Sequence, residues 1–170
     1  MPVGWFWKKF VILHSMNTEL NILLHVVIAS VLGGLIGLER EKVEKPAGVR
    51  TNMLVGGAVA LLVSLGKIIV VYFLDSGLGE YISADPVRII QAIIVGISFI
   101  GAGMVLQIAG EQKIKYLTTA ATILFSTGVG ISVALDQYIL AVGATIFILI
   151  INYFLAIFTR MLRKKGKNRE

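Results

Sequence analysis

The 170-residue sequence contains no cysteine and only two histidines. The absence of cysteine excludes disulfides, thiolate zinc sites and cysteine nucleophiles together, and two scattered histidines argue against a transition-metal site. Charged residues are scarce, at 15%, whereas hydrophobic residues make up 56% of the chain and its mean hydropathy is +0.85. A composition this apolar lies outside the range of soluble globular proteins, so it predicts a membrane protein.

The sequence also lacks the patterns of an enzyme. It shows no nucleophile–base pair, no phosphate-binding loop and no cluster of metal ligands, so we expect neither catalysis nor a bound cofactor or metal. The net charge of +6 could suggest nucleic-acid binding. The basic residues occupy short loops and the tail between apolar runs, however, and we expect the lipid bilayer, not nucleic acid, as the surrounding partner.

Five apolar runs approach the roughly 20 residues that a helix needs to cross a bilayer. We therefore predict an all-α integral membrane protein with helices over residues 20–38, 51–74, 87–108, 117–135 and 138–158. Aromatic residues and lysines occur together over Gly4–Phe10, which is typical of a short interfacial helix. The predicted organisation is an N-terminal interfacial segment (1–19), a transmembrane domain (20–159) and a basic tail (160–170).

The orientation follows from the distribution of lysine and arginine. Four lie in residues 39–50, two in residues 109–116 and six after Thr159, whereas the two intervening loops have none. The positive-inside rule then places the C-terminus in the cytoplasm and the N-terminus outside. Lys8 and Lys9 are a mild contradiction.

The turn between the first two predicted helices carries the densest group of charges. Glu39 and Arg40 leave the first helix, and Arg50 enters the second. A charge drawn toward the bilayer centre costs about 2.5–3.5 kcal/mol on insertion scales, and a cation at a helix N-terminus opposes the helix dipole. We therefore expect Glu39 to accept hydrogen bonds from Arg50 or Arg40, and Thr51 or Asn52 to cap the second helix. The alternative is an ordinary solvated basic loop.

Small residues recur on several of the predicted helices at spacings that let helix backbones approach closely. We expect them to face neighbouring helices. They are Ala29, Gly33 and Gly37 on the first helix, Gly96, Gly101 and Gly103 on the third, and Thr118, Thr122, Ser126, Gly130 and Ala134 on the fourth.

Three polar features allow a functional and a structural interpretation. His25 is conceivable as a proton-linked site, but a satisfied interfacial histidine is favoured. Lys67 either extends to the interface or lines an internal cavity. Asp75, Glu80 and Asp85 offer oxygen ligands for Mg²⁺, but three scattered carboxylates do not make a site, and a solvated outer loop is favoured.

Three motifs follow one another along the chain. The first comprises Gly37–Glu41 and Ala47–Asn52, the second Arg88–Gln91 and Gly96–Gly103, and the third Leu117–Thr122. In this order they resemble the signatures of the MgtC/SapB family of bacterial inner-membrane proteins. The sequence departs from the family pattern at Tyr116, where the family usually has glycine, and at Leu124–Phe125, where it usually has tryptophan. The residues that the resemblance implies to be functional are Glu39, Arg40, Arg50, Thr51, Asn52, Arg88, Gln91, Thr118 and Thr119.

The resemblance implies a link to growth under magnesium limitation. Many members also carry a soluble C-terminal domain, which we do not expect here. Two functions remain open: a regulatory or adaptor protein acting through another membrane protein or a second copy of itself, and a small oligomeric ion transporter or channel. In the second, Glu39, Arg40, Arg50 and Arg88 would line the ion path, and because three arginines repel a cation, the adaptor is favoured.

Overall fold

The structure, a computed structural model, describes the backbone of residues 3–42, 44–75, 85–106 and 117–167 and the side chains of residues 17–42, 44–73, 75, 85–105 and 117–154. The described residues form five α-helices and no strand, which confirms the prediction of an all-α protein. The helices are α1 (Val3–Lys42), α2 (Val49–Asp75), α3 (Pro86–Leu106), α4 (Leu117–Ala134) and α5 (Tyr138–Lys167). The charged loop residues Glu80, Lys113 and Lys115, and also Tyr116, lie outside the described residues.

Four of the helices are long and apolar enough to cross a membrane, which confirms a multi-pass membrane protein. Their candidate spans are Asn17–Lys42, Val49–Phe73, Pro86–Val105 and Leu117–Ala134. The described apolar part of α5, Tyr138–Phe154, is shorter.

The aromatic N-terminal segment is continuous with the first predicted span, because α1 is one helix from Val3 to Lys42. The sequence gives a physical reason: no glycine or proline occurs between Gly4 and Gly33, so nothing interrupts helix propagation where the prediction placed a boundary.

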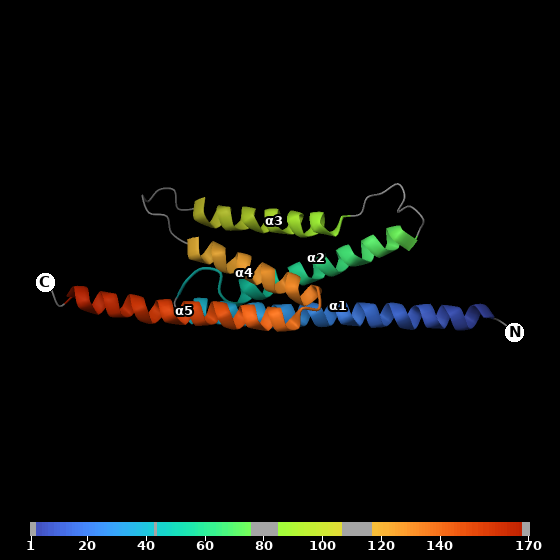
Figure 1. The fold of residues 1–170 in the computed structure, drawn as a ribbon, viewed down its shortest axis with the longest axis horizontal. Helices are drawn as coiled ribbons and strands as arrows, with labels where there is room; N and C mark the ends of the chain where they lie inside the picture. The colour runs from blue at the N-terminus through green and yellow to red at the C-terminus, as the bar shows by residue number, and fades with distance from the viewer. Residues whose placement is uncertain (1–2, 43, 76–84, 107–116, 168–170) are drawn as a thin grey trace.

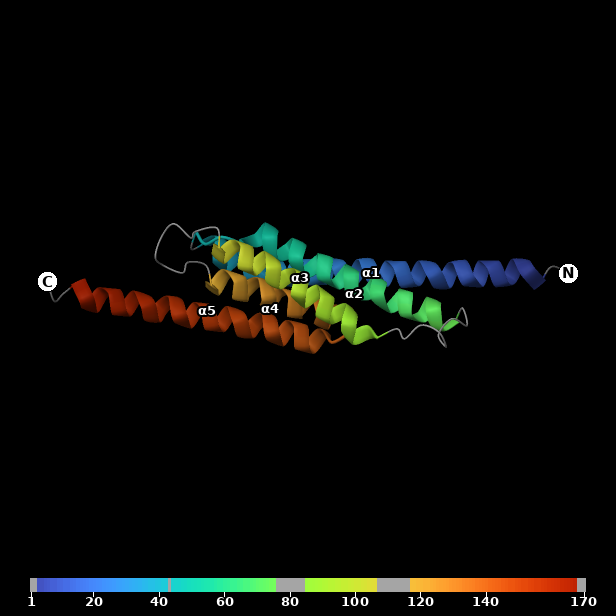
Figure 2. The same ribbon diagram turned by 90° about the horizontal axis from the view of Figure 1, so that it is seen from above.

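The helices form a bundle with α3 at its periphery (Figures 1 and 2). α1 packs against α2, α4 and α5, and α4 also packs against α2 and α5, whereas α3 packs on α2 and α4. The chain termini lie at opposite ends of the molecule (Figure 1). We call the end that carries the α1–α2 turn, residues 39–50, the basic end, and the end that carries the α4–α5 turn, residues 135–137, the distal end.

The α4–α5 turn is a Schellman motif, which closes a helix with a residue in the left-handed conformation. Asp136 has a φ of 62°. Its amide donates to the Val133 carbonyl at 2.9 Å, and the Gln137 amide donates to the Ser132 carbonyl at 2.9 Å. Aspartate tolerates this conformation better than most residues. The same pattern, with Glu44 at a φ of 52°, ends α1.

Small residues bring the backbones of α1, α2 and α4 together. A Cβ atom added at Gly37 would lie 2.6 Å from the Gly48 carbonyl oxygen, and one at Gly130 would lie 2.6 Å from the Gly56 carbonyl oxygen. Such distances leave no room for any side chain, so these glycines set the separation of the helices. Gly33 likewise faces the Asn52 backbone.

Other residues of the predicted packing set are placed differently. An added Cβ at Gly101 would meet Ala120 at 3.3 Å, but Gly96 and Gly103 have nothing within 4 Å among the described residues. On α4, the stripe is buried at Thr122, Ser126, Gly130 and Ala134. Thr118 is exposed and Thr119 is buried instead, because a four-residue spacing drifts against the helical period of about 3.6 residues.

Candidate functional site

The basic end contains a buried arginine. Arg40 continues the buried stripe of α1 that runs through Ala29, Leu32 and Ile36, and only 1% of its surface is exposed. Its Nη2 donates to the Thr119 hydroxyl of α4 at 2.5 Å, and its Nε has no hydrogen-bond partner among the described residues. A buried charged group is costly unless it is paired, and the Thr119 hydroxyl offsets part of this cost for Arg40.

Asn52 joins three segments of the chain near the basic end. Its Nδ2 donates to the carbonyls of Ala47 at 2.6 Å and Gly48 at 3.0 Å. Its Oδ1 accepts from the Ser126 hydroxyl of α4 at 2.7 Å. Asn52 is completely buried, and all of these contacts hold the α1–α2 turn against α2 and α4.

The prediction that Thr51 or Asn52 caps α2 is wrong. Asn52 lies one turn inside the helix and donates to carbonyls, so it does not accept from free amides. The cap comes from α1: the Glu41 Oε2 accepts from the Val49 amide at 3.0 Å. A carboxylate at this position also compensates the positive end of the α2 dipole. Thr51 is half-buried.

The predicted pairing of Glu39 is also wrong. Among the described residues, no ion pair joins Glu39 to Arg40 or Arg50, and the buried Oε2 of Glu39 has no hydrogen-bond partner. Arg50 is exposed. Successive helical residues point about 100° apart, so burial of Arg40 turns Glu39 off the same face, and burial of Asn52 turns Arg50 outward. Glu39 still attracts Arg40 electrostatically.

The remaining sequence-predicted residues lie apart from this group. Arg88 and Gln91 are exposed near the start of α3 at the distal end. The Arg88 Nε lies 3.6 Å from the Asp85 Oδ2, and Asp85 caps α3 by accepting from the Val87 amide at 2.9 Å. The structure therefore pairs Arg40 with Thr119 and Asn52 with Ser126 at the interfaces of α4, and it places Arg88 at the other end of the bundle.

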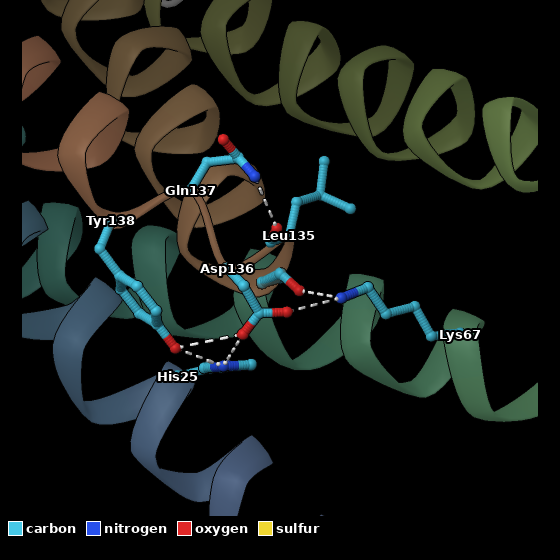
Figure 3. A network of polar contacts seen from close by, with 7 residues as sticks. His25, Lys67, Leu135, Asp136, Gln137 and Tyr138 are labelled. Carbon is cyan, nitrogen blue, oxygen red and sulfur yellow. Dashed lines mark hydrogen bonds and ion pairs between the residues drawn. The ribbon is translucent and has the colours of Figure 1, made fainter.

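A second polar cluster, at the distal end, was not predicted as a group (Figure 3). It consists of His25 of α1, Lys67 of α2, Asp136 of the α4–α5 turn and Tyr138 of α5. The His25 Nε2 lies 3.0 Å from the Asp136 Oδ1 and 2.9 Å from the Tyr138 hydroxyl oxygen. The Tyr138 hydroxyl donates to the same carboxylate oxygen at 3.2 Å. We call these four residues the distal cluster.

Lys67 connects the cluster to the end of α4. Its Nζ donates to the Ala134 carbonyl and lies 3.4 Å from the Asp136 Oδ2. A cation at the last carbonyls of a helix is favourable, because these groups carry the negative end of the dipole. Lys67 also lines an apolar pocket of about 300 Å³ with Gly66, Pro86 and Leu135.

The distal cluster could have been found only partly from the sequence. His25 lies one helical turn before Ala29, so it begins the buried stripe of α1 that Arg40 ends. Nothing local, however, pairs His25 with Tyr138, which is 113 residues away.

The described residues hold no group of three or more His, Cys, Asp or Glu that could bind a metal ion. The larger hollows have apolar walls instead. A groove of about 810 Å³ lies between α2 and α3, and one of about 530 Å³ lies between α3 and α4.

Comparison with known proteins identifies relatives along most of the chain. Residues 26–161 match the MgtC family. The chain is 34% identical over 151 residues to an uncharacterized protein of Haemophilus influenzae, covering 89% of this chain and 62% of that protein. It is 32% identical over 145 residues to the Escherichia coli K12 protein named "Putative magnesium transporter YhiD", and this match covers 85% of this chain and 65% of that protein. It is 38% identical over 136 residues to Protein MgtC of Salmonella typhimurium, and this match covers 78% of this chain and 52% of that protein. The chain thus spans less than two thirds of these relatives, and no solved structure matches it.

Proposed function

We propose a function for this chain from the premise that it belongs to the MgtC family. We propose that it is a multi-pass protein of the bacterial cytoplasmic membrane that regulates another membrane protein by binding it, in the response to magnesium supply, and that it catalyses no reaction. The link to magnesium rests on the family resemblance and on the name of the YhiD relative, which refers to magnesium transport.

The observation that carries the proposal is the exposure of α3. Only 6% of its apolar span is buried, against 33% for α1, 44% for α2 and 50% for α4. α3 therefore contributes little to the folding of the bundle, and both of its flanks are open as apolar grooves. A helix left in this state is available to a transmembrane helix of a partner.

Two glycines of α3 support the same interpretation. Gly96 and Gly103 have nothing within 4 Å among the described residues, and Gly96 lines the α2–α3 groove. Glycine inside a helix is less favourable than alanine by about 1 kcal/mol, and in membranes it is found where another backbone comes close. Because no such backbone approaches among the residues that the structure describes, we assign the approach to a partner helix.

The contacts at the basic end favour binding over transport. Arg40 and Asn52 are buried and bonded to Thr119 and Ser126 across the helix interfaces, so their polar groups hold the bundle together. The grooves beside α3 have apolar walls, which suit a helix or a lipid chain better than a hydrated cation.

Photo-crosslinking in cells grown in low magnesium tests the binding surface. A photoreactive residue at Phe99 of α3, which is 75% exposed, should give a discrete membrane-protein adduct. The same residue at Ile146 of α5, which is also exposed to the lipid region, is the matched control and should not. Equal labelling at both positions would contradict a binding surface on α3, and an adduct of the chain with itself would identify the partner as a second copy.

Reconstitution in liposomes tests the alternative. The purified protein should give no Mg²⁺ or proton flux above empty liposomes. Flux above this background would reject regulation by binding as its only function and favour the transporter.

A further inference from the structure

The groove between α2 and α3 is apolar along its length and carries a cation at one end. Its volume is about 810 Å³, within the range of sites that hold small molecules. Small residues such as Ala58, Ala92 and Gly96 stand among its aliphatic walls, and of the described residues that line it only Arg88 is charged. The groove therefore matches a ligand with a long apolar part and one anionic group.

The charged end of the groove lies near the distal boundary of the bilayer. Arg88 is in the first turn of the candidate span Pro86–Val105, so its Cα is about 3 Å inside the boundary at about 1.5 Å per residue. The next residue, Ile89, packs on Gly66 of α2, where an added Cβ would lie 2.7 Å from the Ile89 Cδ1. Gly66 is about 25 Å from Val49, the first residue of α2, and the hydrocarbon core is about 30 Å thick. A long cationic side chain at this depth reaches the level of the lipid phosphates.

The length of the groove corresponds to one leaflet. On α3 its lining runs from Arg88 to Ile100, which is about 18 Å of helix. Half of the hydrocarbon core is about 15 Å thick. An acyl chain whose headgroup lies at the distal boundary ends near the middle of the bilayer, whereas a transmembrane helix continues through the other leaflet. The dimensions of the groove therefore favour a lipid chain.

Arg88 keeps hydrogen-bond donors for a phosphate. Its side chain is 82% exposed, and its ion pair with Asp85 joins only Nε to Oδ2, at 3.6 Å. An exposed pair of this kind contributes little to stability, and the Oδ1 of Asp85 accepts from the Val87 amide at 2.9 Å. The N–H groups on the Nη atoms of Arg88 form a planar fork, which binds phosphate oxygens in a bidentate manner.

The neighbouring cation at this depth is already held within the bundle. The Nζ of Lys67 donates to the Ala134 carbonyl and lies 3.4 Å from the Asp136 Oδ2. Lys67 also lines a different pocket, on the other side of Ile89. Arg88 is thus the cation that faces the groove between α2 and α3.

We propose that this groove is a phospholipid site, in which Arg88 binds the lipid phosphate and one acyl chain lies between α2 and α3 as far as Ile100. The charge of the phosphate complements the guanidinium, and the apolar walls complement the chain. The site needs no partner protein, so it goes beyond the proposed function. A partner helix that approaches Gly96 would displace the chain from the groove.

Native mass spectrometry of the purified chain in detergent, titrated with palmitoyl-oleoyl phosphatidylglycerol, tests the phosphate contact. The affinity for the first bound lipid should fall about tenfold or more in Arg88→Gln, because charge-assisted hydrogen bonds are lost. Arg50 is exposed at the basic end, so Arg50→Gln is the matched control and should keep the wild-type affinity. Diacylglycerol with the same chains, which lacks the phosphate, should bind the wild type as weakly as phosphatidylglycerol binds Arg88→Gln. Equal affinities of Arg88→Gln and Arg50→Gln, or equal binding of the two lipids, would overturn the proposal.

Two glycine variants of α3 test the position of the acyl chain in the same assay. Gly96 lines the groove and Gly103 does not, and an added Cβ at either would meet nothing within 4 Å among the described residues. Gly96→Phe fills the groove and should weaken binding as much as Arg88→Gln does, whereas Gly103→Phe should leave it unchanged. Equal affinities of the two variants, or a wild-type dimer that binds no lipid, would overturn the proposal. Since no partner is present, the absence of a crosslink at Phe99 in cells would refute the proposed function without changing this result.

Discussion

Adding one methyl group at each of two glycines on α4 tests how the bundle is packed. Gly130 and Gly128 lie two residues apart on the same helix, but they face different surroundings. A Cβ at Gly130 would lie 2.6 Å from the Gly56 carbonyl oxygen and 3.0 Å from the Val59 Cβ, whereas a Cβ at Gly128 would meet nothing within 4 Å among the described residues. The variants Gly130→Ala and Gly128→Ala therefore make the same chemical change with opposite structural consequences.

The magnitudes follow from these distances. The close contact at Gly130 involves backbone, which cannot rotate away, so α2 and α4 must move apart. Overpacking of this kind typically costs about 1–3 kcal/mol. At Gly128 no contact is strained, and replacing glycine by alanine inside a helix is favourable by about 1 kcal/mol. We expect Gly130→Ala to lower the free energy of unfolding by about 1–3 kcal/mol and Gly128→Ala to raise it slightly.

Unfolding by SDS titration in mixed micelles, followed by far-UV circular dichroism, measures both free energies against the wild type. The comparison is internal, since both variants change the helix propensity of α4 equally. If Gly130→Ala were as stable as Gly128→Ala, α2 and α4 would not be in backbone contact, and the packing described above would be wrong.

Three further predictions concern the charges of the chain. Thr119→Ala should lower the free energy of unfolding by about 1.5–3 kcal/mol, because it removes a hydrogen bond to a charged group. When Arg40→Leu is already present, Thr119→Ala should lower the free energy of unfolding hardly at all. An equal loss in the wild type and in the Arg40→Leu variant would refute the contact. The effects of Glu39→Gln and Arg50→Gln on the free energy of unfolding should add in the same assay, because no ion pair joins the two side chains. A coupling energy between the two substitutions would show that they do interact. A periplasm-dependent phosphatase fused after Glu170 should be inactive, by the positive-inside rule, and activity would reverse the topology.

The helices could be predicted from hydropathy because a bilayer imposes their length. α2 begins at Val49, α3 at Pro86 and α4 at Leu117, each within two residues of the predicted start. The start of α1 could not be predicted in the same way. Its N-terminal residues mix aromatic and polar side chains, which changes the hydropathy but not the helical backbone.

Side-chain partners were harder to predict because they depend on helix rotation. Arg40 and Arg50 have the same charge and lie at the same end, yet Arg40 is buried and Arg50 is exposed. The buried stripe of α1 through Ala29 and Ile36 indicates the position of Arg40, since the spacing continues to it. The partner, Thr119, lies 79 residues away, and only the packing of α4 on α1 brings the two together.

The two polar ends have a common role in fixing how α1 lies against α4. Between them the contact is apolar, and in a bilayer an apolar helix surface gains little by facing another helix instead of lipid. Sliding one helix along the other would therefore cost little in the middle. The polar contacts remove this freedom, because His25 on α1 contacts Asp136 and Arg40 on α1 contacts Thr119.

At about 1.5 Å per residue, His25 and Arg40 lie about 23 Å apart along α1, and their two partners are separated by a similar length of α4 and its turn. Because the helices run in opposite directions (Figure 1), both contacts form only in one register, and a slip of one turn would break both and leave two ionisable groups without partners at membrane depth. Arg40, which keeps its charge at every physiological pH, therefore holds this register at the basic end, and the contact of His25 with Asp136 holds it at the distal end.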